Sequence, residues 1–366
     1  MNQWKRAVCL TAAFLLLMGY VQAYSALPRD LTDAVPDTAE DFLRDGDPLW
    51  ESAEYDSGTF SDGVGRIVEN AGETAGPVFR QRLKGAAAIL LAVLLCGAVR
   101  GLCRGETETL ALSLTGALAV TALTAGSLEQ MIGLGWDTIG DLHHFSKSLL
   151  PTLAAAAAAS GSITMATFQQ VTTIFLAEAL IGLMDSLLMP LIYLYVGVLT
   201  ASCALGEDRL SLLAAGLKRI ATSILTGTLL LFTVYLTVFR IISGAADAAA
   251  VRTARAAISH VVPVVGGILA EASEAMLAGA GLLRNSIGIF GMLAILAACI
   301  YPFLQLGIQY LLYKGVALLA AAAGTPELCR LIDGLGGAFG LVLGMAASCA
   351  LLLLISILSF LSAAVP

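Results

Sequence analysis

Long apolar stretches recur along most of the chain after residue 85. One helical crossing of a bilayer core needs about 20 apolar residues. The run 167–205 is long enough for two crossings, and we expect a turn at Asp185-Ser186, before Pro190. Counting the weaker, alanine-rich stretch 149–166 predicts eight spans, and leaving it out predicts seven. The clearest single spans are 86–103, 109–127, 220–242, 287–313 and 337–364.

The composition agrees with this pattern of spans. Hydrophobic residues make up 58% of the 366 residues and charged residues 13%, and the mean hydropathy is +0.86. A soluble domain carries about 25% charged residues. Neither a nucleic-acid-binding protein nor a soluble enzyme fits such values. We therefore predict an all-α polytopic membrane protein, with the lipid bilayer as its surroundings.

Residues 1–23 have the pattern of a cleavable signal peptide. The basic pair Lys5-Arg6 precedes the apolar region Ala7–Tyr20, and Val21-Gln22-Ala23 supplies small residues for signal peptidase. An uncleaved membrane anchor is the alternative interpretation.

Residues 24–84 are predicted to form a short acidic segment outside the cytoplasm. They contain 13 Asp and Glu residues against six Lys and Arg residues, which accounts for the net charge of −7 of the whole chain. We expect one short amphipathic helix over LTDAVPDTAEDFLRD and a loop over DGDPLWESAEYDSGTFSDGVG.

Basic residues predict the orientation, because loops on the cytoplasmic side carry an excess of Lys and Arg. Eight spans after an exported segment place seven basic residues inside and five outside, whereas seven spans give six on each side. The balance therefore favours eight. The inside group is Arg100, Arg104, Arg209, Lys218, Arg219, Lys314 and Arg330, and the outside group is Lys147, Arg240, Arg252, Arg255 and Arg284.

Sequence motifs give no sign of catalysis. The chain lacks the phosphate-binding G-x-x-x-x-G-K-[ST], the zinc-binding H-E-x-x-H and the nucleophile motif G-x-S-x-G. Its seven cysteines form no Cys-x-x-Cys and no paired spacing. We predict no enzyme activity, no cofactor and no metal, so any energy comes from an ion gradient or a partner.

Glu178 is a candidate intramembrane acid. Charged side chains within spans often serve proton or ion pathways, and they also hold helices together. Asp185 follows Glu178 by seven residues, but the expected turn there would place Asp185 in water. Both a pathway and an interhelical contact remain open for Glu178.

Asp137, Asp141 and His144 fall on one helical face, in the segment DTIGDLHHFSK. Such side chains can bind a metal. A structural site needs a fourth ligand, and none is evident, so we favour a solvated amphipathic connector.

Small residues recur every fourth position near the end of the chain, and such stripes allow helices to approach closely. The sequence therefore predicts a helix-packing face, within the chain or between copies. The stripe consists of Gly336, Gly340, Gly344 and Ser348.

Residues 243–286 carry more charge than a lipid-facing span can hold, since each charge at the centre of a span costs roughly 2.5–3.5 kcal/mol. Arg252 and Arg255 share one helical face, and Glu271 and Glu274 share another. The charges are therefore ordered into two amphipathic helices.

A break separates these two helices. Pro263 removes a backbone donor, and Gly266-Gly267 loosens the chain. Irregular backbone at membrane depth requires cover by protein or water. The segment is therefore a broken-helix hairpin that lines a conduit or docks a partner, or a plain interfacial hairpin between two spans. The predicted organisation has five parts. Residues 1–23 are the signal peptide, 24–84 the acidic segment outside the cytoplasm, and 85–242 a first transmembrane bundle. Residues 243–286 form the hairpin, and 287–366 form the last spans.

The same segment resembles a known family. ADAAAVRTARAAISHVVPVVGGILAEASEAMLAGAGLLRNSIGIFG is similar to the core of the stage III sporulation protein AE family. The matching features are Arg252-Thr253-Ala254, Pro263 to Gly267, Glu271 with Glu274, and Arg284-Asn285 before a glycine-rich span. F-Q-Q-V at 168–171 and the many spans are also in keeping with the family.

The resemblance implies a role in endospore-forming bacteria. It implies a multi-pass subunit in the mother-cell membrane around the forespore, with residues 24–84 facing the space between the two membranes. The implied partners are the other stage III A-operon proteins and stage II sporulation protein Q, in a channel complex needed for forespore development after engulfment. A sibling subunit resembles a secretion ATPase, which agrees with the missing phosphate-binding motif here.

Two other functions remain open beside the channel subunit. One is a stand-alone secondary transporter that uses Glu178 for ion coupling, and the other is a purely structural scaffold. Each is compatible with a homo-oligomer.

Overall fold

The computed structural model describes residues 31, 34–36, 57–101, 105–161, 163–206, 208–261 and 266–361. All regular secondary structure within these ranges is helical, and six helices are long and apolar enough to cross a membrane. The predicted all-α multi-pass fold is therefore confirmed. The predicted signal peptide lies outside the described residues.

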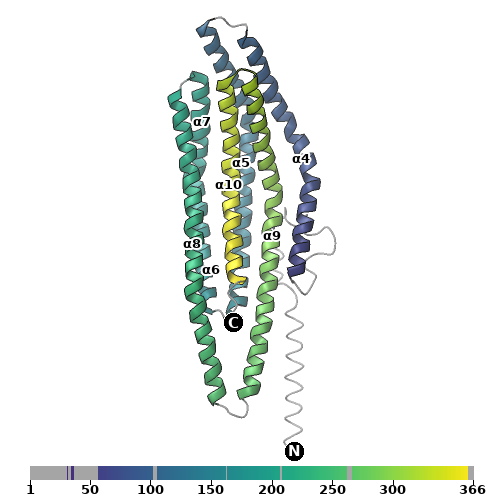
Figure 1. The fold of residues 1–366 in the computed structure, drawn as a ribbon, viewed down its shortest axis with the longest axis vertical. Coiled ribbons are helices and arrows are strands. Elements are labelled where there is room, and N and C mark those ends of the chain that lie inside the picture. Colours follow the sequence, from purple (N-terminus) through teal and green to yellow (C-terminus); the bar gives the residue numbers. More distant parts are fainter. Residues whose placement is uncertain are drawn as a thin grey trace, which may run out of the picture.

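The helices run alternately up and down as long rods (Figure 1). The longest has 57 residues, which at 1.5 Å per residue is about 85 Å. A hydrocarbon core is about 30 Å thick, so such helices extend well beyond it. The elements are α4 (Ser57–Arg100), α5 (Glu106–Ala159), α6 (Ile163–Leu183), the π-helical segment η1 (Met184–Leu188), α7 (Met189–Leu205), α8 (Asp208–Val261), α9 (Gly266–Ala322) and α10 (Pro326–Leu361).

Short reversals join consecutive rods, and a glycine with a positive φ lies at three of them. Gly161 follows α5 with a φ of 94°, Gly206 follows α7 with a φ of 68°, and Gly324 follows α9 with a φ of 75°. Side chains with a Cβ atom rarely adopt this left-handed conformation, so glycine at these positions allows the helix to end and the chain to turn back.

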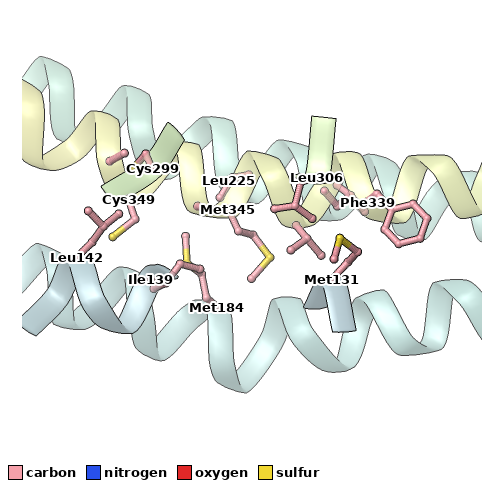
Figure 2. Packing of buried hydrophobic residues seen from close by; sticks show 14 of the residues in the cluster. Met131, Ile139, Leu142, Met184, Leu225, Cys299, Leu306, Phe339, Met345 and Cys349 are labelled. Carbon is pink, nitrogen blue, oxygen red and sulfur yellow. The ribbon is translucent and has the colours of Figure 1, made fainter. Parts of the chain in front are cut away.

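Helix α10 is the centre of the bundle and packs against α5, α7, α8 and α9. Figure 2 shows side chains of α5 and α10 meeting around Met184. The ring of Phe339 packs edge-on against Tyr313 of α9, with 4.9 Å between the ring centroids. The buried α5 and α10 side chains labelled there are Met131, Ile139, Leu142, Phe339, Met345 and Cys349.

The stretch 149–166 is not a separate span, which corrects one of the predicted counts. Helix α5 continues unbroken from Glu106 to Ala159, with Pro151 inside it. Its polar middle is amphipathic: Ile139 and Leu142 are buried, while Asp141 is exposed on the opposite face. The polar residues therefore mark one face of a continuous helix and not the end of a span.

The expected turn at Asp185-Ser186 is also wrong. Residues Met184–Leu188 form a π-helical segment that joins α6 to α7 in one rod. The wider π turn absorbs the local irregularity without reversing the chain. With both corrections, the described residues contain six membrane-length helices in place of seven or eight.

The predicted loop over DGDPLWESAEYDSGTFSDGVG is wrong from Ser57 onward, because α4 begins there. Its residues before Ser57 lie outside the described residues. Helices also run through the predicted boundaries at 84/85, 242/243 and 286/287. Most of the expected short helix near residue 31 lies outside the described residues, but Leu31 and Val35 are buried against the core.

Candidate functional site

A helical hairpin of α8 and α9 extends beyond one end of the bundle (Figure 1). The end of α5 lies beside Arg284 of α9, because Arg284 Nη1 donates a hydrogen bond to Ser160 Oγ at 3.3 Å. Helix α10 ends at the same height, since a Cβ atom added to Gly288 would meet the side chain of Leu361. Helix α9 begins about 18 residues before Arg284, so its free part is about 27 Å long.

The residues predicted to shape a conduit lie in this projecting part. Helix α8 ends at Val261 and α9 begins at Gly266, and Pro263 lies between them, outside the described residues. Their individual roles stay predictions. On the backbone, Arg252 and Arg255 belong to the last turns of α8, and Gly266, Gly267, Glu271 and Glu274 belong to the first turns of α9.

Glu178 forms an ionic cluster with two residues of α5. Its carboxylate lies 3.1 Å from Nε2 of His143 and 3.3 Å from Nζ of Lys147. The Glu178 side chain is 51% exposed, so it lies at the surface of the bundle and not submerged in its interior. The cluster joins α5 to α6 across their outer edge.

The sequence had separated Glu178 from the segment 137–147, and the structure brings the two together. Asp137, Asp141 and His144 are exposed along the outer face of α5, while His143 turns toward α6. Among the residues that the structure describes, no three His, Cys, Asp or Glu side chains are arranged to hold a metal ion.

Arg82 forms a polar clamp that the sequence did not reveal. Its Nη1 donates to Oε1 of Gln130 in α5 at 3.0 Å, and its Nη2 donates to Oε1 of Gln305 in α9 at 2.6 Å. Gln305 is only 7% exposed. Gln305 within an apolar span was the available signal, because a buried amide needs a hydrogen-bond partner.

Two ion pairs join the helix ends at the other end of the bundle. Arg100 of α4 contacts Glu327 of α10, with Nη1 and Oε2 2.5 Å apart. Lys314 of α9 pairs with Asp333 of α10. These contacts fix the amino-terminal turns of α10 against its neighbours.

Buried hydroxyl and amide groups join α6 to α10. The Gln169 amide donates to the backbone carbonyl of Ser356 at 2.7 Å. The hydroxyls of Thr173 and Ser356 lie 2.7 Å apart. At the other end of the same rod, Tyr195 donates to the carbonyl of Gly334 at 2.8 Å. Together these contacts set the register between the two rods.

The small-residue stripe of α10 faces neighbouring helices of the same chain. A Cβ atom on Gly336 would lie 3.1 Å from Cβ of Tyr313, and one on Gly344 would lie 3.3 Å from Leu225. Ser348 donates its hydroxyl to the carbonyl of Gly344 at 2.8 Å, within α10. A role for the stripe beyond this packing stays a prediction.

Comparison with known protein families matches residues 87–364 to the family described as stage III sporulation protein AE. The chain belongs to this family. The resemblance inferred from residues 252–291 is thereby confirmed, and the protein is a multi-pass membrane protein with a role in sporulation. The description of the family names a role in sporulation.

The chain is also similar to the stage III sporulation protein AE of Bacillus subtilis (strain 168), with 25% identity over 210 residues. The match covers 57% of this chain and 53% of the relative, so the chain spans about half the length of the curated relative it matches. No solved structure matches the chain.

Proposed function

We propose that this protein is a non-enzymatic membrane subunit of a channel complex that links the mother cell to the forespore. It would lie in the mother-cell membrane around the forespore, with the other stage III A-operon proteins and stage II sporulation protein Q as partners. Family membership over residues 87–364 is the observation that carries the proposal. The complex would sustain forespore development after engulfment.

The projecting hairpin supports a role in contacting partners. Five charged residues of the hairpin are Asp247, Arg252 and Arg255 on α8, and Glu271 and Glu274 on α9. A helix pair that extends about 27 Å past the bundle can reach a subunit outside the bilayer or line an entrance to a conduit. The hairpin is therefore the segment that we assign to docking or conduit lining.

The position of α4 fits the predicted orientation. A Cβ atom on Gly63 would meet Leu293, so the start of α4 lies toward the hairpin end of α9. The start of α4 and the hairpin then lie toward the same end of the bundle. Under the proposed orientation this end faces the space between the two membranes.

The break in the hairpin can be tested in the sporulating host. We expect Pro263→Ala and Gly267→Leu to lower the yield of heat-resistant spores at unchanged protein level, because each favours a continuous helix over the break. The matched control is Gly279→Leu, since a Cβ atom on Gly279 meets nothing within 4 Å. If both break variants insert normally and sporulate fully, the segment is a connector only.

Charge-neutralising changes distinguish docking from a scaffold. Replacing Arg252 and Arg255 by glutamine, or Glu271 and Glu274 by glutamine, should weaken recovery of partner subunits and reduce spore yield. A purely structural scaffold would keep both assembly and sporulation through every such change.

One observation favours a second candidate function. The contact of Glu178 with His143 and Lys147 groups three ionisable side chains among apolar helices. Such groups are used for ion coupling in membrane transporters. The alternative is therefore a stand-alone secondary transporter, which predicts transport by this protein alone.

A further inference from the structure

The ammonium group of Lys218 lies where α7, α8 and α10 meet. A Cβ atom added to Gly337 of α10 would lie 2.6 Å from Nζ of Lys218 and 3.2 Å from the hydroxyl oxygen of Tyr195 of α7. Lys218 is half-buried, so its ammonium group is turned toward α10 and is still partly accessible from outside. Glycine at position 337 leaves the space that this group occupies.

The charge of Lys218 is not balanced within the bundle. Among the residues that the structure describes, its ammonium group makes no hydrogen bond and no ion pair. Helix α10 carries two acidic residues, and other cations engage both of them. Arg100 binds Glu327, and Lys314 binds Asp333. A cation beside apolar helices is costly unless an anion accompanies it, so this position calls for an anionic ligand.

An open strip of α10 begins beside Lys218 and runs toward the hairpin end of the bundle. Its first three residues are half-buried, and the last two are 44% and 56% exposed, although α10 is the central helix. Intervals of four, three, four and seven residues place all five on one face of the helix. This α10 strip consists of Gly340, Gly344, Ala347, Leu351 and Leu358.

Helices α8 and α9 border the α10 strip on its two sides. A Cβ atom on Gly344 would lie 3.3 Å from Leu225 of α8, and one on Gly340 would lie 3.3 Å from the ring of Tyr310 of α9. Figure 1 shows α10 between α8 and α9, with α5 behind it. The strip is therefore a long apolar surface between two flanking helices, with a lysine at one end.

The dimensions of this surface suit a lipid chain. The distance from Gly337 to Leu351 along the helix is about 21 Å, which is longer than half of a hydrocarbon core of about 30 Å. Lys218 and Lys314 belong to the basic residues that the sequence assigns to the cytoplasmic side. Under that orientation the lysine end of the strip lies at the headgroup level, and the strip extends from there into the hydrocarbon.

We propose that an anionic phospholipid of the cytoplasmic leaflet binds here, with its phosphate at the ammonium group of Lys218 and one acyl chain along the α10 strip. Charge complementarity selects this occupant. A phosphate supplies the acceptor oxygens and the negative charge that Lys218 lacks, and hydrocarbon covers the strip without leaving a polar group unpaired. The site goes beyond the proposed function and does not depend on it.

Thermal unfolding of the purified protein in a mild detergent tests the site. Phosphatidylglycerol should raise the thermal midpoint more than phosphatidylcholine does, because a ligand that binds only the folded protein stabilises it. In Lys218→Gln, the concentration of phosphatidylglycerol that gives half of the effect should rise on the order of fivefold. Arg209→Gln is the matched control, since Arg209 is an exposed basic residue of the same helix.

A second variant displaces the ammonium group and keeps every charge. Gly337→Ala puts a methyl group where Nζ of Lys218 lies, so it should weaken the response to phosphatidylglycerol as Lys218→Gln does. Its control is Gly315→Ala, because a Cβ atom on Gly315 meets nothing within 4 Å. This variant decides the question if Lys218→Gln does not fold.

Four results would overturn the proposal. Equal effects of phosphatidylglycerol and phosphatidylcholine would mean that the site does not select an anion. A loss of the response in Arg209→Gln as large as in Lys218→Gln would reduce the effect to general surface charge. Inorganic phosphate or soluble glycerophosphoglycerol acting as strongly as the lipid would mean that no acyl chain is bound. A stable dimer without retained lipid in native mass spectrometry would show that a second copy covers the strip.

The expected result in native mass spectrometry is a chain that retains phosphatidylglycerol, with less retention in Lys218→Gln than in Arg209→Gln. None of these outcomes affects the recovery of partner subunits from sporulating cells. Failure of the lipid site and failure of the channel-subunit proposal are therefore distinguishable.

Discussion

The Arg82 guanidinium donates a hydrogen bond to the side-chain oxygen of Gln305 at 2.6 Å, and this contact ties α4 to the buried face of α9. The same guanidinium bonds Gln130 of α5 at 3.0 Å. One side chain therefore connects three helices.

Removing the clamp should destabilise the bundle. Arg82→Met leaves the Gln305 amide buried without this donor, which costs about 1–3 kcal/mol for a buried polar group. We expect a lower thermal midpoint for the protein in detergent.

Two variants control for this effect. Arg219→Met removes an exposed arginine and should leave the midpoint unchanged. Adding Gln305→Leu to Arg82→Met should recover part of the loss, because no buried amide then lacks its partner. Equal midpoints for Arg82→Met and Arg219→Met would show that the clamp contributes nothing.

Close packing of α10 on α9 should make Gly336 intolerant of larger side chains. A Cβ atom there would already lie 3.1 Å from Cβ of Tyr313. Gly336→Leu should cost about 1–3 kcal/mol, since overpacking forces the helices apart. The matched control is Gly315→Leu on α9, where an added Cβ meets nothing within 4 Å. Similar thermal midpoints for both variants would contradict this packing.

The pair of Arg100 and Glu327 should respond to charge reversal. Arg100→Glu places two carboxylates together and should lower the thermal midpoint, whereas Arg100→Glu with Glu327→Arg should restore most of it. For a partly exposed pair the gain is on the order of 0.5–1 kcal/mol. A combined variant as unstable as Arg100→Glu alone would mean that the contact of 2.5 Å is not an energetic coupling.

Glu178 separates the transporter from the channel subunit. Because Glu178 is half exposed and engaged by Lys147, we expect Glu178→Gln only to lower the thermal midpoint by loosening the edge between α5 and α6. We expect the purified chain alone to transport nothing. Lys147→Gln should also lower the thermal midpoint. The combined variant should lower it by less than the sum of the two single decreases, because both variants remove the same contact. Uptake or efflux by the purified protein in liposomes, abolished by Glu178→Gln, would support the transporter instead.

Hydropathy along the sequence predicted the fold class, because apolar stretches of bilayer length can only be helical in lipid. It failed where polarity follows a helix face. The polar segment 137–147 suggested a connector between spans, yet Leu142 within it is buried and belongs to the continuous helix α5. A sequence window averages the two faces and so divides one helix into two spans.

Contacts between residues far apart in the sequence could not be predicted from it either. Arg82, Gln130 and Gln305 are each unremarkable in isolation, and up to 223 residues separate them. The π-helical segment at Met184–Leu188 likewise has no simple pattern, and Pro190 after Asp185 resembles a turn. By contrast, the break before Gly266 and the family motif around it are local, and local signals can be read from sequence.

Co-purification tests the central claim most directly. Tagged protein should be extracted in mild detergent from cells at the engulfment stage, and the bound proteins identified by mass spectrometry. The account predicts recovery of the other stage III A-operon proteins, reduced by the charge-neutralising changes in the hairpin. Recovery of this protein alone, under conditions that preserve other membrane complexes, would contradict the channel-subunit account.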